Sequence, residues 1–162
     1  MAEQGEQSLG GYLYGATSLA LDAKSRLAIP TRYHTRLHEE CEGELVITVD
    51  WRDRCLLIYP LPEWEQVQKR LMDLPSFSSQ ARLVQRLMMG HATDAKIDSH
   101  GRVLITPALR EHAQIDKSVM LLGQGNKFEV WDSKLWQQQR DDWVGNSHGV
   151  EQLAPEVANL KI

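Results

Sequence analysis

An internal repeat constrains the fold of this chain more than any other feature of its sequence. Residues 15–29 read GATSLALDAKSRLAI, and residues 91–105 read HATDAKIDSHGRVLI. Without a gap, Ala16, Thr17, Asp22, Arg26 and Ile29 match Ala92, Thr93, Asp98, Arg102 and Ile105. A second match follows in the same order, since CLLIYPLPEW at 55–64 parallels KFEVWDSKLW at 127–136. Two collinear matches predict a duplicated module.

Each copy begins with the pattern of two short strands around a polar turn. In the first copy, apolar residues alternate with small or polar ones over 17–21 and 27–29, on either side of DAKSR. The second copy has DSHGR, where Gly101 suits the positive φ of a tight turn. Thr106 is the expected N-cap of a short helix that starts at Pro107. That helix is predicted to bury Leu109 and Ala113, and its counterpart Tyr33 and Leu37.

A pair of strands and a helix complete each copy. The strands are predicted at 45–49 and 55–59, and at 119–122 and 128–131, the second pair being joined by a GQGNK hairpin. Closing helices are predicted at 63–74 and 133–144, with a linking helix at 80–89. A unit of about 50 residues with such short strands can scarcely build its own core, so the two copies are predicted to pack against each other.

The bulk composition indicates an ordinary globular chain in a reducing compartment. Hydrophobic residues make up 42% and charged residues 25% of the 162 residues. An apolar run long enough for a membrane span and a secretory signal are both absent from the sequence. Cys41 and Cys55 form no CxxC pair and suggest no disulfide framework. These observations favour a cytoplasmic protein.

The charge is distributed unevenly along the chain. A net charge of -4 argues against a simple polycationic DNA binder. Between residues 22 and 38, however, Asp22 is opposed by four cations: Lys24, Arg26, Arg32 and Arg36. The following stretch, residues 39–54, contains six acidic side chains and two arginines. An acidic chain of this kind can still present a basic face.

The turn DAKSR has residues suited to nucleic-acid contact. Lys24 and Arg26 lie two apart, so in an extended hairpin they would point to the same side. An arginine can donate two hydrogen bonds to O6 and N7 of guanine, whereas a lysine more readily meets a phosphate. Asp22 could brace Arg26 or the backbone of the loop. The alternative is a solvated turn with an incidental cluster of charges.

The same motifs carry a resemblance to a known family. The signature D-x-K-x-R before an apolar run and a proline, followed later by LLIYPLPEWE, resembles the MraZ family. HATDAKIDSHGRVLITPALREHA and MLLGQGNKFEVW are similar to the second half of that family, so that the similarity covers roughly residues 12–136. The resemblance implies an α+β, mainly β fold: a duplicated AbrB-like swapped-hairpin β-barrel with flanking helices.

The resemblance also implies a function and an assembly. Members of the family form ring-shaped homo-oligomers and bind short G-rich direct repeats in the promoter of the division and cell wall gene cluster, usually as repressors. The implied divisions of this chain are a first module at 12–64, connecting helices at 65–89, a second module at 90–136, and a C-terminal helix and tail at 137–162. Residues 1–11 precede the usual start of the family and are left out of the predicted fold.

The implied DNA-binding residues are Lys24, Arg26, Arg32 and Arg102, with Asp22, Asp98 and Gly101 supporting the loops. The sequence departs from the family at Ser25, where glycine is usual, and at His100, which replaces a lysine-like position. The second loop is therefore expected to bind DNA more weakly than the first.

Two alternatives from other classes remain open. One is a ring-shaped protein-interaction scaffold that binds no DNA. The other is a small hydrolase or metal enzyme that uses His34, His38 and Asp22, although no Walker, HExxH or GxSxG motif occurs. His34, His38 and Cys41 have the spacing of metal ligands, but a fourth ligand is not evident, and no metal or cofactor is expected. We predict a non-enzymatic, nucleoid-associated regulator whose partners are double-stranded promoter DNA and copies of itself, without a membrane or a small-molecule substrate.

Overall fold

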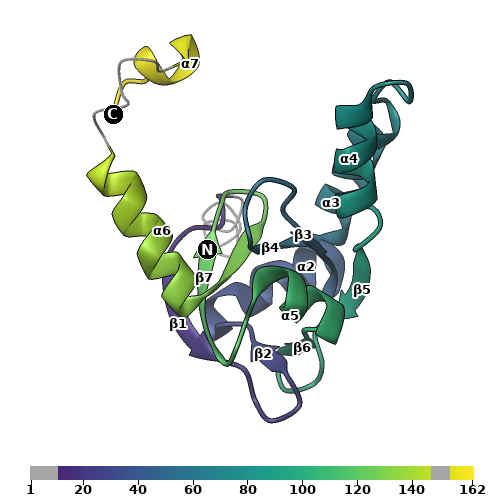
Figure 1. Ribbon diagram of the computed structural model, residues 1–162. Helices are drawn as coiled ribbons and strands as arrows, with labels where there is room; N and C mark the ends of the chain where they lie inside the picture. The colour runs from purple at the N-terminus through teal and green to yellow at the C-terminus, as the bar shows by residue number, and fades with distance from the viewer. Residues whose placement is uncertain (1–10, 147–153) are drawn as a thin grey trace.

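The computed structural model describes residues 11–146 and 154–162, and it confirms the α+β class. Six strands form one antiparallel sheet (Figure 1), in the order β1 (Ala16–Ala20), β7 (Ser118–Gly123), β8 (Phe128–Asp132), β4 (Leu56–Pro60), β3 (Glu44–Val49) and β5 (Thr93–Lys96). A separate antiparallel ladder pairs β2 (Arg26–Ala28) with β6 (Arg102–Leu104). The predicted strands are thus confirmed to within two residues at their ends.

The two copies exchange their first strands. β1 of the first copy pairs with β7 of the second, and β5 of the second pairs with β3 of the first. The copies also meet where β4 pairs with β8 and where β2 pairs with β6. The hairpin expected around DAKSR is therefore wrong, because the strands on either side of this turn join different ladders. The positive φ of Ser25, 61°, bends the chain between them.

One apolar core is built from both copies, as the repeat predicts. Its side chains with at most 1% of their surface exposed include Leu27, Leu37 and Ile47 from the first copy and Val103, Leu109 and Leu121 from the second. Full burial of such a side chain contributes about 1.5–3 kcal/mol to folding. Ala113 and Tyr33 are also buried, so the predicted inner faces of the two short helices are confirmed.

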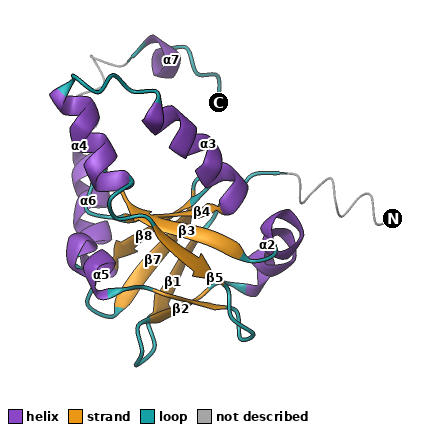
Figure 2. Cartoon of the chain, turned by 90° about the vertical axis from the view of Figure 1, so that its right-hand side faces the viewer, coloured by secondary structure: helices purple, strands orange, loops and turns teal. Residues whose placement is uncertain are grey.

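The helices flank this body. The short ones are η1 (Thr31–Tyr33) with α2 (His34–Cys41), and α5 (Pro107–Ala113), whose N-cap is Thr106 as predicted. The longer ones are α3 (Leu61–Met72), α4 (Ser79–Met88) and α6 (Ser133–Gly145), followed by α7 (Pro155–Ala158). The α3–α4 hairpin projects from one end of the body, and β2 lies at the opposite end (Figure 2). None of the helices in the described residues combines the length and apolarity that a bilayer crossing needs.

Candidate nucleic-acid interface

The two turns of the repeat share one backbone conformation. In the first turn, the N–H of Asp22 donates to the carbonyl of Arg26 (3.0 Å), and the N–H of Ser25 donates to the carbonyl of Asp22 (2.9 Å). In the second turn, the N–H of Asp98 donates to the carbonyl of Arg102 (2.9 Å), and Gly101 donates to Asp98 (3.0 Å). The sequence similarity of the repeat therefore extends to the hydrogen bonds that fold each turn.

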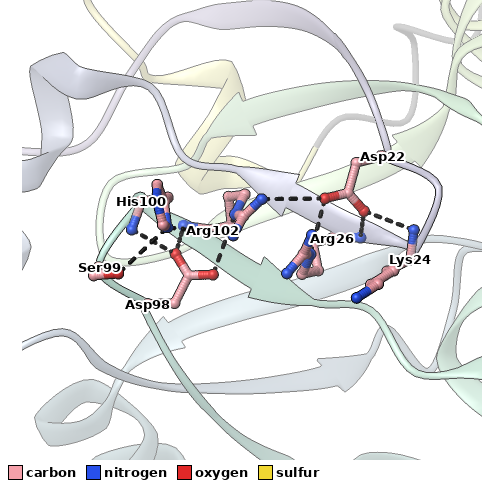
Figure 3. A network of polar contacts seen from close by, with 7 residues as sticks. All are labelled: Asp22, Lys24, Arg26, Asp98, Ser99, His100 and Arg102. Carbon is pink, nitrogen blue, oxygen red and sulfur yellow. Dashed lines mark hydrogen bonds and ion pairs between the residues drawn. The ribbon is translucent and has the colours of Figure 1, made fainter.

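An aspartate organises each turn through its carboxylate (Figure 3). Oδ1 of Asp22 accepts the backbone N–H groups of Lys24 and Arg26, both at 2.9 Å, and Oδ2 accepts Nε of Arg26 at 2.8 Å. Asp98 does the same in the second turn, accepting Nε of Arg102 at 3.2 Å. Each aspartate therefore holds both the backbone of its turn and the guanidinium of its arginine.

These hydrogen bonds keep both aspartates ionised. The pKa of the Asp22 carboxyl lies below its ordinary value, chiefly because the backbone N–H of Arg26 donates to it. The pKa of Asp98 is lowered in the same way by the backbone N–H of Arg102. A carboxylate that accepts several N–H groups is more stable in its charged form. In each turn, the charge of the aspartate balances the charge of the arginine. The net charge of the turn therefore depends on its third residue.

The β2–β6 ladder brings the two turns side by side. Arg26 lies opposite Leu104 and Arg102 lies opposite Ala28, so both arginines are on the outer face of the ladder, while Leu27 on the other face is buried. Nη1 of Arg102 lies 3.6 Å from Oδ2 of Asp22, so this aspartate contacts the arginines of both copies (Figure 3). Sequence reasoning identified these residues but not their proximity, because strand pairing between copies leaves no local signal.

Backbone hydrogen bonds tie each turn to the other copy. The N–H of Ile29 donates to the carbonyl of Gly101, and the N–H of Ile105 donates to the carbonyl of Ser25, both at 2.9 Å. The position of each turn therefore depends on the strand that follows the opposite turn.

The two turns differ at their third residue, Lys24 or His100, and at their fourth, Ser25 or Gly101. Gly101 has the positive φ that its sequence context predicts, 77°, and Ser25 adopts the same conformation with a side chain. Lys24 lies in the turn and precedes this positive φ, so Lys24 and Arg26 do not belong to one extended strand as expected. Its side chain is exposed, and no other described residue forms a hydrogen bond or ion pair with its Nζ.

The two arginines differ in how their terminal nitrogens are engaged. Arg26 contacts Asp22 through Nε, and among the described residues no hydrogen bond uses its Nη atoms. Arg102 approaches Asp22 through Nη1, and its Nη2 lies 3.4 Å from Nδ1 of His100. The donor pair of Arg26 is therefore more available to a ligand than that of Arg102.

Arg32 is held elsewhere. Its Nη2 donates to Oγ1 of Thr17 at 2.8 Å and to the hydroxyl of Tyr33 at 2.9 Å. Its guanidinium carbon lies 4.8 Å from the centre of the Tyr33 ring. Arg32 thus braces η1 against β1 and takes no part in the Asp22 network.

The residues considered for a metal site or an enzyme do not come together. Nε2 of His34 pairs with the carbonyl of Ile29 (2.6 Å), and the buried thiol of Cys41 donates to the carbonyl of Leu37 (3.1 Å). Within the described residues, His34, His38 and Cys41 do not form a metal-ligand cluster. His34 and His38 line an open cavity of about 850 Å³ beside the second turn, whereas Asp22 belongs to the first turn.

Comparison with known proteins agrees with the resemblance in the motifs. The family model for the MraZ protein, described as antitoxin-like, matches residues 12–87 and again 88–152. A transcriptional regulator MraZ of Halorhodospira halophila is 48% identical over 149 residues, which are 91% of this chain and 98% of that protein. The regulator of the same name from Thioalkalivibrio sulfidiphilus is 54% identical over 129 residues, covering 80% and 85%. That from Methylococcus capsulatus is 47% identical over 148 residues, covering 90% and 97%.

Proposed function

Because the chain belongs to the MraZ family, whose members are transcriptional regulators rather than enzymes, we propose that it regulates transcription by binding specific DNA sequences with its two Asp–Arg turns. The observation that supports this most directly is the position of Arg26 and Arg102 on one outer face of the β2–β6 ladder. Lys24 adds an exposed cation beside them. A chain of net charge -4 thereby has a local face with cations directed at solvent.

The dimensions of the ladder suit the major groove. Neighbouring strands lie about 4.7–4.9 Å apart, and the major groove of B-DNA is about 12 Å wide, so a two-stranded ribbon with its side chains can enter. Arg26 is the proposed base reader, because Asp22 orients its Nε and leaves its terminal nitrogens for O6 and N7 of guanine. Lys24 is the proposed phosphate contact.

Other residues have supporting roles in this proposal. Arg102 reads DNA more weakly, because Asp22 and His100 already engage its terminal nitrogens. Asp98 and Gly101 keep the second turn in shape. Arg32 contributes a phosphate contact at most, since its donors are directed at Thr17 and Tyr33.

The finer parts of the proposal rest on the family resemblance. We infer that the exchange of first strands is the swapped-hairpin arrangement of AbrB-like barrels, with modules at 12–64 and 90–136, connecting helices at 65–89 and a C-terminal part at 137–162. We further infer a ring-shaped homo-oligomer, located with the nucleoid in the cytoplasm. Its target is the promoter of the division and cell wall gene cluster, which includes its own gene, and it represses transcription from short G-rich direct repeats there.

Binding of the full-length protein to the promoter upstream of its own gene tests this function. With Lys24 neutralising one phosphate, the logarithm of the binding constant should fall with the logarithm of salt concentration at a slope of about -0.9 per chain. Arg26→Ala should remove sequence preference at one base pair, whereas Lys24→Ala should reduce the slope by about 0.9. Lys69→Ala, which removes an exposed cation on α3, is the matched control and should change neither.

The outcome separates this proposal from the scaffold alternative. Full-strength, sequence-specific binding by Arg26→Ala would show that the turn face is not the reader. An oligomer that forms normally but shows no salt-dependent shift of promoter DNA would favour the protein-interaction scaffold.

A further inference from the structure

Three groups with metal-ligating atoms meet at the junction between the two copies, away from the turn face. They are Asp50 after β3, Cys55 before β4, and Glu129 on β8. One carboxylate oxygen from each acid and the Cys55 sulfur all lie within 4.8 Å of one another. Donor atoms around a tetrahedral zinc ion are about 3.4–3.6 Å apart, given its usual bond lengths to oxygen and sulfur. Small rotations of the side chains would close this difference.

The thiol in this group has no partner of its own. Cys55 is completely buried, and within the described residues no hydrogen bond involves its sulfur. Cys41, the other buried cysteine, donates to a backbone carbonyl instead. Cys55 is therefore a buried thiol without a hydrogen-bond partner among the described residues; Leu122 and Trp131 pack against it, and two carboxylates lie near its sulfur.

The carboxylates are oriented by their neighbours in a way that leaves one oxygen of each available. Oδ1 of Asp50 accepts the backbone N–H groups of Arg52 (2.7 Å) and Asp53 (3.0 Å). Oε1 of Glu129 accepts the indole N–H of Trp131 at 2.8 Å. Among the described residues, no hydrogen bond uses Oδ2 of Asp50 or Oε2 of Glu129. Metal-binding carboxylates are commonly held by such outer hydrogen bonds.

Among the described residues, ion pairs with basic side chains do not compensate the charges of this group. In the part of the chain that the structure describes, no lysine or arginine forms an ion pair with Asp50 or Glu129. Partly buried anions that are not paired with basic side chains are found where a metal ion compensates them.

We propose that Asp50, Cys55 and Glu129 bind a zinc ion, with water as the fourth ligand. A thiolate selects zinc over magnesium or calcium, and two carboxylates complete a ligand combination that zinc accepts. Binding releases the thiol proton to solvent, and the sulfur then coordinates as thiolate. The site occurs once per chain, because the equivalents of Cys55 and Glu129 in the repeat are Lys127 and Leu57.

The site would join the two copies at the centre of the sheet. Asp50 and Cys55 come from the β3–β4 connection of the first copy, whereas Glu129 comes from the second. Leu57 faces Glu129 in the β4–β8 ladder, which is the central contact between copies. A zinc ion here stabilises the folded chain, since the unfolded chain keeps these ligands apart. The proposal is independent of DNA binding.

Metal titration of the chelator-treated, full-length protein tests the site. Zinc binding is measured by calorimetry, and cobalt replaces zinc as a probe whose near-ultraviolet absorption reports thiolate ligation. We expect one zinc per chain and a thiolate–cobalt band in the parent and in the control variant Cys41→Ser. Cys55→Ser should lose the band. Glu129→Gln, which keeps the acceptor for Trp131, should weaken zinc binding at least about 10-fold.

Thermal unfolding gives a second readout. At a zinc concentration 100 times the dissociation constant, the ratio of folded to unfolded parent protein should rise about 100-fold, and the same rise is expected for Cys41→Ser. Failure of the parent to bind zinc, or equal binding by the parent and Glu129→Gln, would overturn the proposal. Glu129 is only partly buried, so this variant decides the question even if Cys55→Ser does not fold. A cobalt band in a folded Cys55→Ser protein would assign the metal to other residues.

Discussion

Replacement of Ser25 by glycine is expected to stabilise the protein. Ser25 has a φ of 61°, and its equivalent in the second turn is a glycine with a φ of 77°. A residue with a side chain in this left-handed region lowers the stability of the folded protein by about 1–2 kcal/mol, and glycine avoids that cost. Glycine also gives the unfolded chain more conformational freedom, which cancels about 0.4–1 kcal/mol of this gain in stability. The free energy of unfolding of Ser25→Gly should therefore rise by about 1 kcal/mol.

Two substitutions in the second turn are matched controls. Ser99 is exposed and does not have a positive φ, so Ser99→Gly relieves no left-handed strain. It gives the unfolded chain more freedom and removes the exposed contact of the Ser99 hydroxyl with Nδ1 of His100 (3.3 Å), so it should lower stability by about 0.4–1 kcal/mol. Gly101→Ala adds a Cβ that would lie 2.5 Å from Cε1 of His34, and it also introduces left-handed strain. Its cost should be about 2–4 kcal/mol, the largest of the three.

Reversible thermal unfolding followed by circular dichroism measures all three variants. For a chain of this size, 1 kcal/mol corresponds to a change in midpoint temperature of about 2–4 °C. The reasoning is refuted if Ser25→Gly is no more stable than Ser99→Gly relative to the parent, because the conformation of Ser25 would then carry no strain.

Three further predictions concern the turns. Arg26→Ala should weaken operator binding by about 1–3 kcal/mol per module and Arg102→Ala by less, as measured by fluorescence anisotropy; the reverse order would make the second copy the main reader. The lowered pKa values of Asp22 and Asp98 mean that these carboxylates stabilise the folded protein. This contribution is complete above their ordinary pKa of 3.8 and is lost as the pH falls through their lower folded-state pKa values. The midpoint temperature of Asp22→Asn should therefore fall less under acid than that of the parent. If chains form the proposed ring, affinity should rise by about 10²–10⁴ when DNA repeats are added at a spacing of about 10 bp and should drop at half-turn spacing; equal affinity for single and multiple repeats would exclude multivalent reading.

Local patterns were sufficient to predict the strands and the longer helices of this fold, whereas α7 (Pro155–Ala158) was not predicted. The alternation around DAKSR and DSHGR predicted β1, β2, β5 and β6, and the GQGNK segment predicted the β7–β8 hairpin. The need for positive φ at Gly101 followed from its residue type. These features depend on neighbours along the chain, and the sequence displays such neighbours directly.

Partners that are distant in the sequence could not be predicted in this way. Alternation of apolar residues in β1 fits a pairing with β2 as well as it fits β7, and the choice depends on the shared core. The contact of Asp22 with Arg102 follows from the β2–β6 pairing and has no signal in either turn alone. The same is true of Glu129, which joins Asp50 and Cys55 only through the β4–β8 ladder.

The joining of both copies in one chain removes a symmetry requirement. Two separate chains that exchanged their first strands would have identical turns, and their common face would read the same sequence in either direction, as twofold dimers read palindromes. Here the first turn has Lys24 and Ser25 where the second has His100 and Gly101. Because both turns are encoded in one chain, a substitution in the first turn leaves the sequence of the second turn unchanged. The face formed by the two turns therefore lacks twofold symmetry and has a direction. A protein that binds direct repeats needs such a direction, whereas a protein that binds inverted repeats does not.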